Sequence, residues 1–208
     1  QLFVHMVSHD LRNPLTVIGG FTTELERRRE ELGIDGEMLS GLQAIRRGVH
    51  RMDGMIQDLT DMARTEGGQL QLKCEPVALA DYLPDLLWRS AAALAVDRVR
   101  LDLPADLPPV SADYVRLDRI VTNLLSNALK YSDSATPVFV RARRVDDQVE
   151  VCVTDQGRGI APEDLPRLFA RFARVGTQRK VEGIGLGLYI TRMLVEAHGG
   201  HIEVESEV

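Results

Sequence analysis

The sequence predicts an α+β protein in two parts. The first is an N-terminal helical hairpin that forms a dimeric four-helix bundle, and the second is an α/β sandwich in which a mixed sheet carries helices on one face. Three observations predict this class. Apolar residues recur at helical spacing over 1–66, Gly67 and Gly68 interrupt that pattern, and strand-like and helix-like segments are mixed over 67–208. We therefore expect one domain over 1–66 and another over 67–208.

The hairpin is predicted from the spacing of its apolar residues. The first helix covers 1–31 and should end at Gly33 and the turn 34–36. The second segment carries a heptad seam, with apolar residues alternately four and three apart: Met38, Leu42, Ile45, Val49, Met52, Ile56, Leu59 and Ala63. A hairpin with one such seam buries its apolar surface poorly alone, so we expect a homodimer. A seam packed against the rest of its own chain is the alternative.

The second part alternates between two kinds of pattern. Helical spacing predicts helices over 79–95, 114–131 and 186–198, and a short helix over 162–172. Alternating apolar residues predict strands over 70–73 and 99–103, a hairpin of 138–145 with 148–154, and a last strand from His201. A proline-rich connection separates the strand at 99–103 from the helix at 114–131.

Composition restricts the classes of function. The chain has 208 residues, 44% hydrophobic and 27% charged, which is enough to bury a core. A net charge of -6 argues against a nucleic-acid partner, because phosphate backbones favour clustered Lys and Arg. Cys74 and Cys152 lack metal-binding or redox spacing, which favours a reducing compartment. No apolar run approaches the roughly 20 residues that cross a bilayer. We expect a cytoplasmic location, with any membrane anchor in a missing upstream region.

One polar cluster lies in the first helix around His9. Arg12 and Asn13 share its helix face, whereas Asp10 is an immediate neighbour that points elsewhere. Pro14 removes one helical hydrogen bond, so the helix should bend just after His9. His9 lies off the apolar stripe and should be exposed; the stripe consists of Phe3, Val7, Leu11, Leu15 and Ile18. Taken alone, such a histidine is more often an ordinary surface residue.

A second polar group lies on the helix predicted over 114–131. Asn123 and Asn127 are one turn apart, so two carboxamide oxygens can reach one hard cation such as Mg²⁺. Lys130 adds a positive charge for phosphate, and Tyr131 follows it. A helix with an ordinary polar face explains these residues equally well.

Two glycine-rich segments follow. Asp155, Gly157 and Gly159 come directly after a strand, where glycines permit a tight turn close to a ligand and Asp155 can accept from an amino group such as adenine's. An ordinary Asp-Gly turn looks similar. The second segment is 183–188, where Gly183, Gly185, Leu186 and Gly187 open a helix whose amides suit an anion. It follows neither the Walker nor the Rossmann pattern.

In this order and spacing, the motifs resemble those of the catalytic core of a sensor histidine kinase of two-component signalling. The resemblance covers essentially all 208 residues. Residues 8–14 resemble the phosphoacceptor box, 123–131 the N box, 155–159 the first glycine box, 168–172 the F box and 183–188 the second glycine box. It implies that 1–66 is the dimerisation and phosphotransfer hairpin and that the remainder is a Bergerat-type ATP-binding domain.

The resemblance also implies a mechanism. ATP would bind with its adenine on Asp155, its Mg²⁺ near Asn123 and Asn127, and its phosphates near Lys130 and the second glycine box, with Arg171 in reach. His9 would attack the γ-phosphoryl group with Asp10 as base. The phosphoryl group would then pass to an aspartate in the receiver domain of a response regulator. Asn13 matches the position that orients water for the reverse phosphatase activity.

The sequence departs from the family pattern at two places. Ala173 stands where an aromatic residue is common, next to the segment 174–182 that resembles the ATP lid. The chain also ends at Val208, before the family's final strand, which should leave an exposed sheet edge. Two other functions stay open. A Bergerat-type ATPase is disfavoured because those relatives carry a glutamate where Asn123 stands, and a dimeric scaffold that does not transfer phosphate is disfavoured by the intact motifs.

Overall fold

The chain folds into two compact units, Gln1–Leu70 and Gln71–Val208. The computed structural model describes residues 2–66, 70–91, 93–173 and 185–208. Within these residues, no helix is both long enough and apolar enough to cross a membrane.

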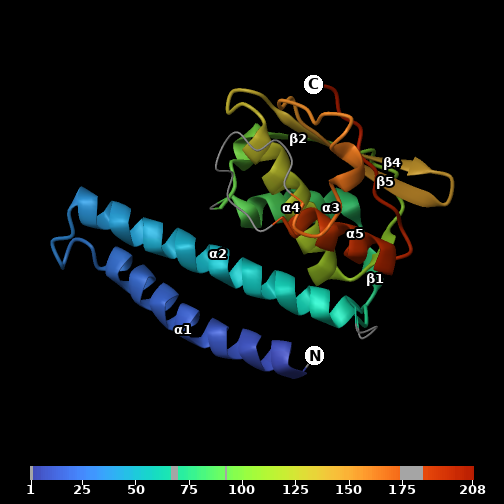
Figure 1. The fold of residues 1–208 in the computed structure, drawn as a ribbon. Coiled ribbons are helices and arrows are strands. Elements are labelled where there is room, and N and C mark those ends of the chain that lie inside the picture. The colour runs from blue at the N-terminus through green and yellow to red at the C-terminus, as the bar shows by residue number, and fades with distance from the viewer. Residues whose placement is uncertain (1, 67–69, 92, 174–184) are drawn as a thin grey trace. The chain divides into compact units, whose positions relative to one another are not determined.

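The first unit is a helical hairpin, formed by α1 (Leu2–Arg27) and α2 (Gly36–Glu66) (Figure 1). Helix α1 continues through Pro14 without a break and ends four residues before the predicted boundary, at a series of turns that closes with Gly33 at φ 63°. Asp35 caps the start of α2, because its Oδ1 accepts from the backbone N–H of Met38 at 2.8 Å. The predicted pair of helices is therefore present.

The heptad pattern of the hairpin divides between two faces. Leu15 on α1 and Val49 and Ile56 on α2 are buried together and form the core of this unit. The alternate positions remain exposed: Leu11, Ile18 and Leu25 on α1, and Met38, Ile45 and Met52 on α2. Among the seam residues whose burial the structure describes, one hairpin thus buries Val49 and Ile56 and leaves Met38, Ile45 and Met52 exposed.

The second unit is built on two sheets. A three-stranded sheet has the order β2-β4-β5 and contains β2 (Val99–Asp102), β4 (Val138–Val145) and β5 (Gln148–Thr154). β2 runs parallel to β4, and β4 runs antiparallel to β5, so the sheet is mixed. A small antiparallel sheet joins β1 (Glu75–Val77) to β3 (Val110–Ala112).

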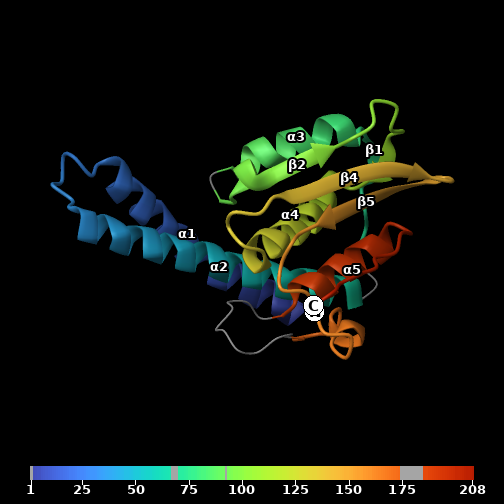
Figure 2. The ribbon, with the colours of Figure 1, turned by 90° about the horizontal axis from the view of Figure 1, so that it is seen from above.

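Three helices cover one face of the larger sheet: α3 (Leu79–Ser90), α4 (Tyr114–Tyr131) and α5 (Gly187–Ala197) (Figures 1 and 2). Along β4, Val138, Val140 and Ala142 are buried, while Arg141 and Arg143 alternate with them on the exposed face. The buried strand residues join Leu83 and Leu86 of α3 and Leu125 of α4 in one core. The predicted fold class, a mixed sheet with helices on one face, is confirmed.

Four predicted elements of the second unit are wrong or displaced. The strand expected over 70–73 is displaced to β1, which pairs with β3. No strand was predicted at β3, which lies in the proline-rich connection, so the pairing that positions β1 was missed. The helix expected over 79–95 ends at Ser90, and η1, a 3₁₀ turn, follows at Val96–Arg98. The helix expected over 162–172 is only η2, the 3₁₀ turn Leu165–Arg167. Residues 201–208 form no strand, and Ser206 Oγ instead accepts from the backbone N–H of Ile160 at 2.9 Å.

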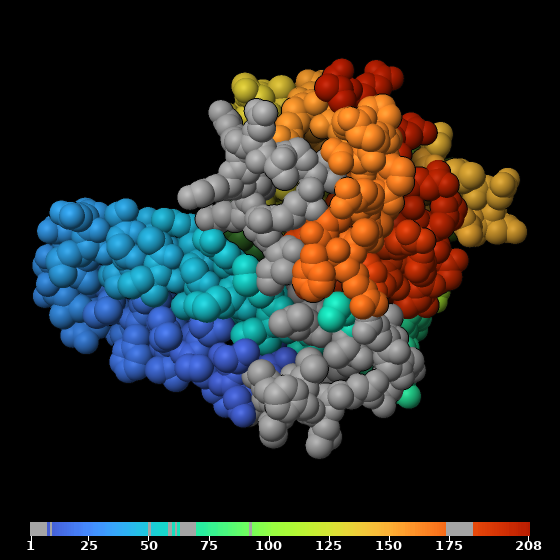
Figure 3. Space-filling view, viewed as in Figure 1, coloured from blue at the N-terminus to red at the C-terminus, as the bar shows by residue number. Residues whose placement is uncertain are grey.

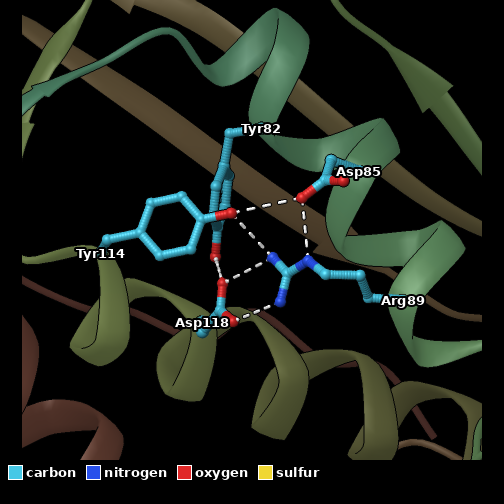
Figure 4. A network of polar contacts seen from close by, with 5 residues as sticks. All are labelled: Tyr82, Asp85, Arg89, Tyr114 and Asp118. Atoms are coloured by element: carbon cyan, nitrogen blue, oxygen red, sulfur yellow. Dashed lines mark hydrogen bonds and ion pairs between the residues drawn. The ribbon is translucent and has the colours of Figure 1, made fainter.

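A polar network fastens α3 to α4 (Figure 4). The buried Tyr82 hydroxyl donates to Asp118 Oδ1 at 2.8 Å, and Arg89 bridges Asp118 and Asp85, each at 2.8 Å. Burial raises the pKa of Tyr82 well above its usual range, and the hydrogen bond to Asp118 raises it further. Tyr82 therefore stays protonated and keeps donating, which holds α4 at a fixed position on α3.

Candidate functional site

The first candidate region is the part of α1 around His9. Its neighbour Ser8 is buried and accepts a hydrogen bond from the Thr60 hydroxyl of α2 at 2.9 Å. One turn later, Arg12 donates to Asp53 and Gln57 of α2, each at 2.8 Å. These contacts fix the register of α1 against α2 on both sides of His9. Thr60, Asp53 and Gln57 were not predicted, because nothing local in the sequence pairs them with α1.

The predicted catalytic residues all lie on this helix. Asp10 and Asn13 are exposed, as a group that meets a second molecule must be. The side chain of His9 lies outside the described residues, so its predicted exposure stays a prediction.

The second region begins with Asn123 of α4. Its Nδ2 donates to Thr191 Oγ1 of α5 at 2.7 Å, and Thr191 is only 2% exposed. A Cβ at Gly187 would lie 2.5 Å from Asn123 Oδ1, so a larger residue there would displace this carboxamide. The N box and the second glycine box therefore meet through Asn123.

Asn123 and Asn127 fit a magnesium ion by the chemistry of their donors. The nitrogen of Asn123 is bound to Thr191, which leaves its oxygen as the acceptor, and the half-buried Asn127 lies one turn farther along the same face. Magnesium takes oxygen ligands and keeps waters and phosphates in its other positions. These two amides are candidate ligands by their donor chemistry. In the described parts of the chain, no group of three or more His, Cys, Asp or Glu could hold a metal.

The end of α4 brings an aromatic ring and two cations together. Lys130 Nζ lies 5.5 Å and Arg158 Cζ 5.7 Å from the centroid of the Tyr131 ring, which is 40% exposed. Arg158 was not predicted, since only Asp155 and the glycines on either side of Arg158 were singled out in this segment. A nucleotide carries a flat base and negative phosphates, and this group offers a partner for each.

The first glycine box lies against the same end of α4. Asp155 Oδ1 accepts from the backbone N–H of Gly157 at 2.7 Å, which closes a tight turn. A Cβ at Gly157 would lie 2.7 Å from the Tyr131 carbonyl oxygen, and Ser132 and Gly157 form an isolated β-bridge. The N box and the first glycine box are therefore in contact.

Two of the motif glycines are explained by the protein's own backbone. Gly159 has φ 70°, and a Cβ there would lie 1.8 Å from the Glu207 carbonyl oxygen (Figure 3, where the red C-terminal atoms lie against orange atoms). Gly185 has φ 77°, and its Cβ would lie 2.5 Å from the Ala173 carbonyl oxygen. Close approach to a ligand was the predicted reason for the glycines of the first box, but contact within the chain suffices for Gly159.

The remaining predicted residues lie around the first turn of α5. Leu186, directly before this helix, is 1% exposed and serves as core. Arg171 Cζ lies 5.0 Å from the ring centroid of Tyr189 on α5. Gly183 and the segment 174–182 lie outside the described residues. The residues that are described bring all three nucleotide motifs together around the second half of α4.

Comparisons with known proteins agree with this arrangement. The family described as the His Kinase A (phospho-acceptor) domain matches residues 1–68, and the family of histidine kinase-, DNA gyrase B- and HSP90-like ATPases matches residues 112–208. A non-motile and phage-resistance protein of Caulobacter vibrioides is 37% identical over 98% of this chain and 25% of its own length. The sensor histidine kinase CusS of Escherichia coli K12 is 37% identical over 97% of this chain and 42% of its own length.

Solved structures give the same result. ShkA, crystallised at full length with AMPPNP, is 26% identical with a TM-score of 0.71, over 98% of this chain and 43% of that one. The mycobacterial sensor histidine kinase MprB is 33% identical with a TM-score of 0.50, over 61% of this chain and 80% of that one. The chain spans less than half the length of the two curated relatives named above.

The predicted resemblance is thereby confirmed: a phosphoacceptor hairpin and an ATPase domain follow each other on one chain, and the nucleotide motifs of the second meet around α4. The chain belongs to the sensor histidine kinase family.

Proposed function

We propose that this chain uses ATP and Mg²⁺ to phosphorylate His9 and then passes the phosphoryl group to an aspartate in the receiver domain of a response regulator. The observation that supports this most directly is the meeting of the N box with both glycine boxes around α4, on the same chain as the hairpin that carries His9. A nucleotide site and a phosphoacceptor are the two parts that such a reaction needs.

Each part of the nucleotide has a partner among the described residues. Asp155 accepts from the adenine amino group, and Tyr131 offers its ring to the base. Lys130 and Arg171 provide positive charge for the phosphates, and the opening of α5 provides backbone amides. Asn123 and Asn127 would hold Mg²⁺ through their oxygens, and the bound ion would supply positive charge for the phosphate groups.

The transfer step uses the residues of α1. The neutral imidazole of His9 attacks the γ-phosphorus, so that a nitrogen–phosphorus bond forms while the bond from phosphorus to the leaving ADP oxygen breaks. Asp10 accepts the proton from the other ring nitrogen. A carboxylate oxygen of the regulator's aspartate then attacks the same phosphorus while the nitrogen–phosphorus bond breaks, and Asp10 returns the proton to the other ring nitrogen, so that His9 leaves as the neutral imidazole. Asn13 orients the water that removes phosphate from the regulator in the reverse activity.

The working form is a homodimer of hairpins. Leu11, Ile18 and Leu25 on α1, with Met38, Ile45 and Met52 on α2, leave an apolar stripe on each hairpin that a second copy can cover. We place this dimer in the cytoplasm, where the receiver domain of a response regulator is reached.

A labelling experiment tests the proposal. The 208-residue chain is incubated with γ-labelled ATP and Mg²⁺, and the label on the protein should be labile in acid and stable in base, as a phosphoramidate is. His9→Gln should take up none, while the matched control His5→Gln on the same helix should label normally. Label on His9→Gln would disprove the assignment of His9.

Two other results would point to the rival functions. Continuous release of phosphate without labelled protein would establish an ATPase in place of a kinase. Binding of ADP with neither label nor phosphate release would establish a scaffold that does not transfer phosphate.

A further inference from the structure

Arg98 makes an unusual set of contacts for a residue outside every motif. It is the last residue of η1 and half-buried. Its Nε donates to the Thr136 carbonyl oxygen at 3.0 Å and its Nη1 to the Leu129 carbonyl oxygen at 3.1 Å. Its Nη2 donates to Ser132 Oγ at 2.7 Å and to the Asp133 carbonyl oxygen. All four acceptors lie within residues 129–136.

The strand register explains why Arg98 reaches this segment. β2 runs parallel to β4 with Val99 opposite Val138, so the residue before β2 lies beside the residues before β4. Residues 132–137 are the connection from the end of α4 into β4. One side chain at the start of β2 therefore reaches the last turn of α4 and the whole connection.

The guanidinium matches what the end of a helix requires. The last carbonyl oxygens of a helix have no helical partner and carry the negative end of the helix dipole, so a cation that donates to them stabilises the end. Leu129 supplies one such oxygen, and Ser132, Asp133 and Thr136 supply three more acceptors just beyond the helix. Four of the five N–H donors of Arg98 are thereby used, so the group serves as a clamp and not as an anion site.

The clamped segment belongs to the proposed nucleotide site. Lys130 and Tyr131 lie between Leu129 and Ser132, two of the residues that Arg98 holds. Ser132 also forms the β-bridge with Gly157 of the first glycine box. Any shift of this segment moves a cation, an aromatic ring and the glycine loop together.

We propose that Arg98 is a positioning residue for nucleotide binding, which sets Lys130, Tyr131 and the first glycine box in place without touching the nucleotide. This inference rests on the proposed function. It predicts a specific effect on nucleotide affinity, because displacing binding groups by about 1 Å is costly even when the displaced groups are intact.

The test compares Arg98→Ala with Arg100→Ala in the full 208-residue chain. Arg100 is a matched control two residues away, and its Nη1 donates to the carbonyl oxygens of Asp97 and Val99 within its own segment. The dissociation constant of ADP is measured by calorimetry, and the rate of His9 phosphorylation is measured at saturating ATP. We expect Arg98→Ala to weaken ADP binding about tenfold and to leave the saturated rate within about twofold, and Arg100→Ala to change neither.

Arg98→Lys separates positioning from general stability. A lysine keeps the charge, but its ammonium cannot match the forked geometry of a guanidinium. We expect Arg98→Lys to restore most of the melting temperature that Arg98→Ala loses, while ADP binding stays several-fold weaker than in the parent chain. Because Arg98→Lys keeps the charge, it still tests the proposal where Arg98→Ala does not fold.

Two results would overturn the inference. One is equal ADP affinity in Arg98→Ala and Arg100→Ala, and the other is full recovery of affinity in Arg98→Lys. Asp155→Asn distinguishes failure of the Arg98 inference from failure of the proposed nucleotide site. If the site is correct, Asp155→Asn should weaken ADP binding whether or not Arg98 is a positioning residue. If Asp155→Asn binds ADP normally, the proposed nucleotide site itself is wrong.

Discussion

Asn123 shows how one hydrogen bond can decide which atom of a side chain is left for a ligand. A carboxamide offers a donor at one end and an acceptor at the other, and only the acceptor can bind a cation. The nitrogen of Asn123 donates to the Thr191 hydroxyl at 2.7 Å, and Thr191 is only 2% exposed. Thr191 thus fixes the orientation of Asn123, a proposed metal ligand, without being a proposed ligand itself.

Thr191→Val tests this role of the hydroxyl. Valine has nearly the same shape but no acceptor, so the nitrogen of Asn123 loses its partner and the carboxamide is free to turn. We expect the gain in ADP affinity caused by Mg²⁺ to fall about tenfold, as is typical when a partner of a metal ligand is removed. ADP binding in EDTA should stay unchanged. Calorimetry with and without Mg²⁺ measures both.

Thr191→Ser is the matched control, since it keeps the hydroxyl and removes only a methyl group. It should behave like the parent chain in its response to Mg²⁺. Equal responses in Thr191→Val and Thr191→Ser would show that the hydroxyl does not orient the ligand.

The roles of Thr191 and Arg98 could not be predicted from the sequence. Asn123, Asp155 and Gly157 could be predicted as site candidates, because their motifs are local strings with fixed spacing. The partners of Thr191 and Arg98 lie 68 and 31–38 residues away in the sequence. Such contacts depend on strand register and helix packing, which no local pattern specifies.

The helices and strands also differ in how well the sequence predicted them. The bounds of α4 and of the β4–β5 hairpin match their predictions, because a capping Asp113, continuous periodicity and a two-residue turn all lie within the segment itself. β1 and β3 are three residues each and pair with each other across the 32 residues, 78–109, that separate them. Short strands of this kind carry too little local signal, which is why one was displaced and the other missed.

Helix α4 carries the N box, and Asp113 holds its first turn. The carboxylate accepts from the backbone N–H of Arg116 at 3.1 Å and of Lys73 at 2.9 Å. Burial raises the pKa of this carboxyl, but the N–H donors of Lys73 and Arg116 lower it by more, so the net pKa lies below its ordinary value. The charged form is therefore favoured in the folded chain.

Asp113→Ala should cost about 1 kcal/mol of unfolding free energy at pH 7, the usual value of a capping side chain. Because the folded-state pKa is lowered, the ionised carboxylate stabilises the fold fully above the unfolded-state pKa of about 3.9. That contribution is lost as the pH falls through the lower folded-state pKa. The difference between the parent chain and Asp113→Ala should therefore narrow from pH 7 toward pH 3, as measured by urea denaturation at each pH.

Asp106→Ala is the matched control for the change in charge, because Asp106 is exposed in a loop. It should alter the unfolding free energy little at any pH. A constant difference between the parent chain and Asp113→Ala across the pH range would contradict the role of the ionised cap.

In the described part of the hairpin, packing within one chain accounts for some residues of the predicted seam and leaves others exposed. Val49 and Ile56 of α2 pack on Leu15 of α1, so part of the seam is intramolecular, which was the alternative reading. Met38, Ile45 and Met52 recur every seven residues on the exposed side of α2. A repeat of seven residues is the spacing by which helices pair, so these exposed residues favour a second copy of the hairpin as their partner.

Ile45→Glu tests this assembly. Burying one isoleucine side chain in the interface contributes about 1.5–3 kcal/mol to the free energy of dimerisation. Because the dimer is twofold symmetric, the substitution removes this contribution once in each copy. We expect the dimer dissociation constant to rise by about a hundredfold or more, as measured by sedimentation over a range of concentrations. Ser40→Glu is the matched control, because Ser40 is exposed on the opposite face of α2 and the substitution adds the same charge there. A dimer that Ile45→Glu leaves intact would show that this stripe is not the interface.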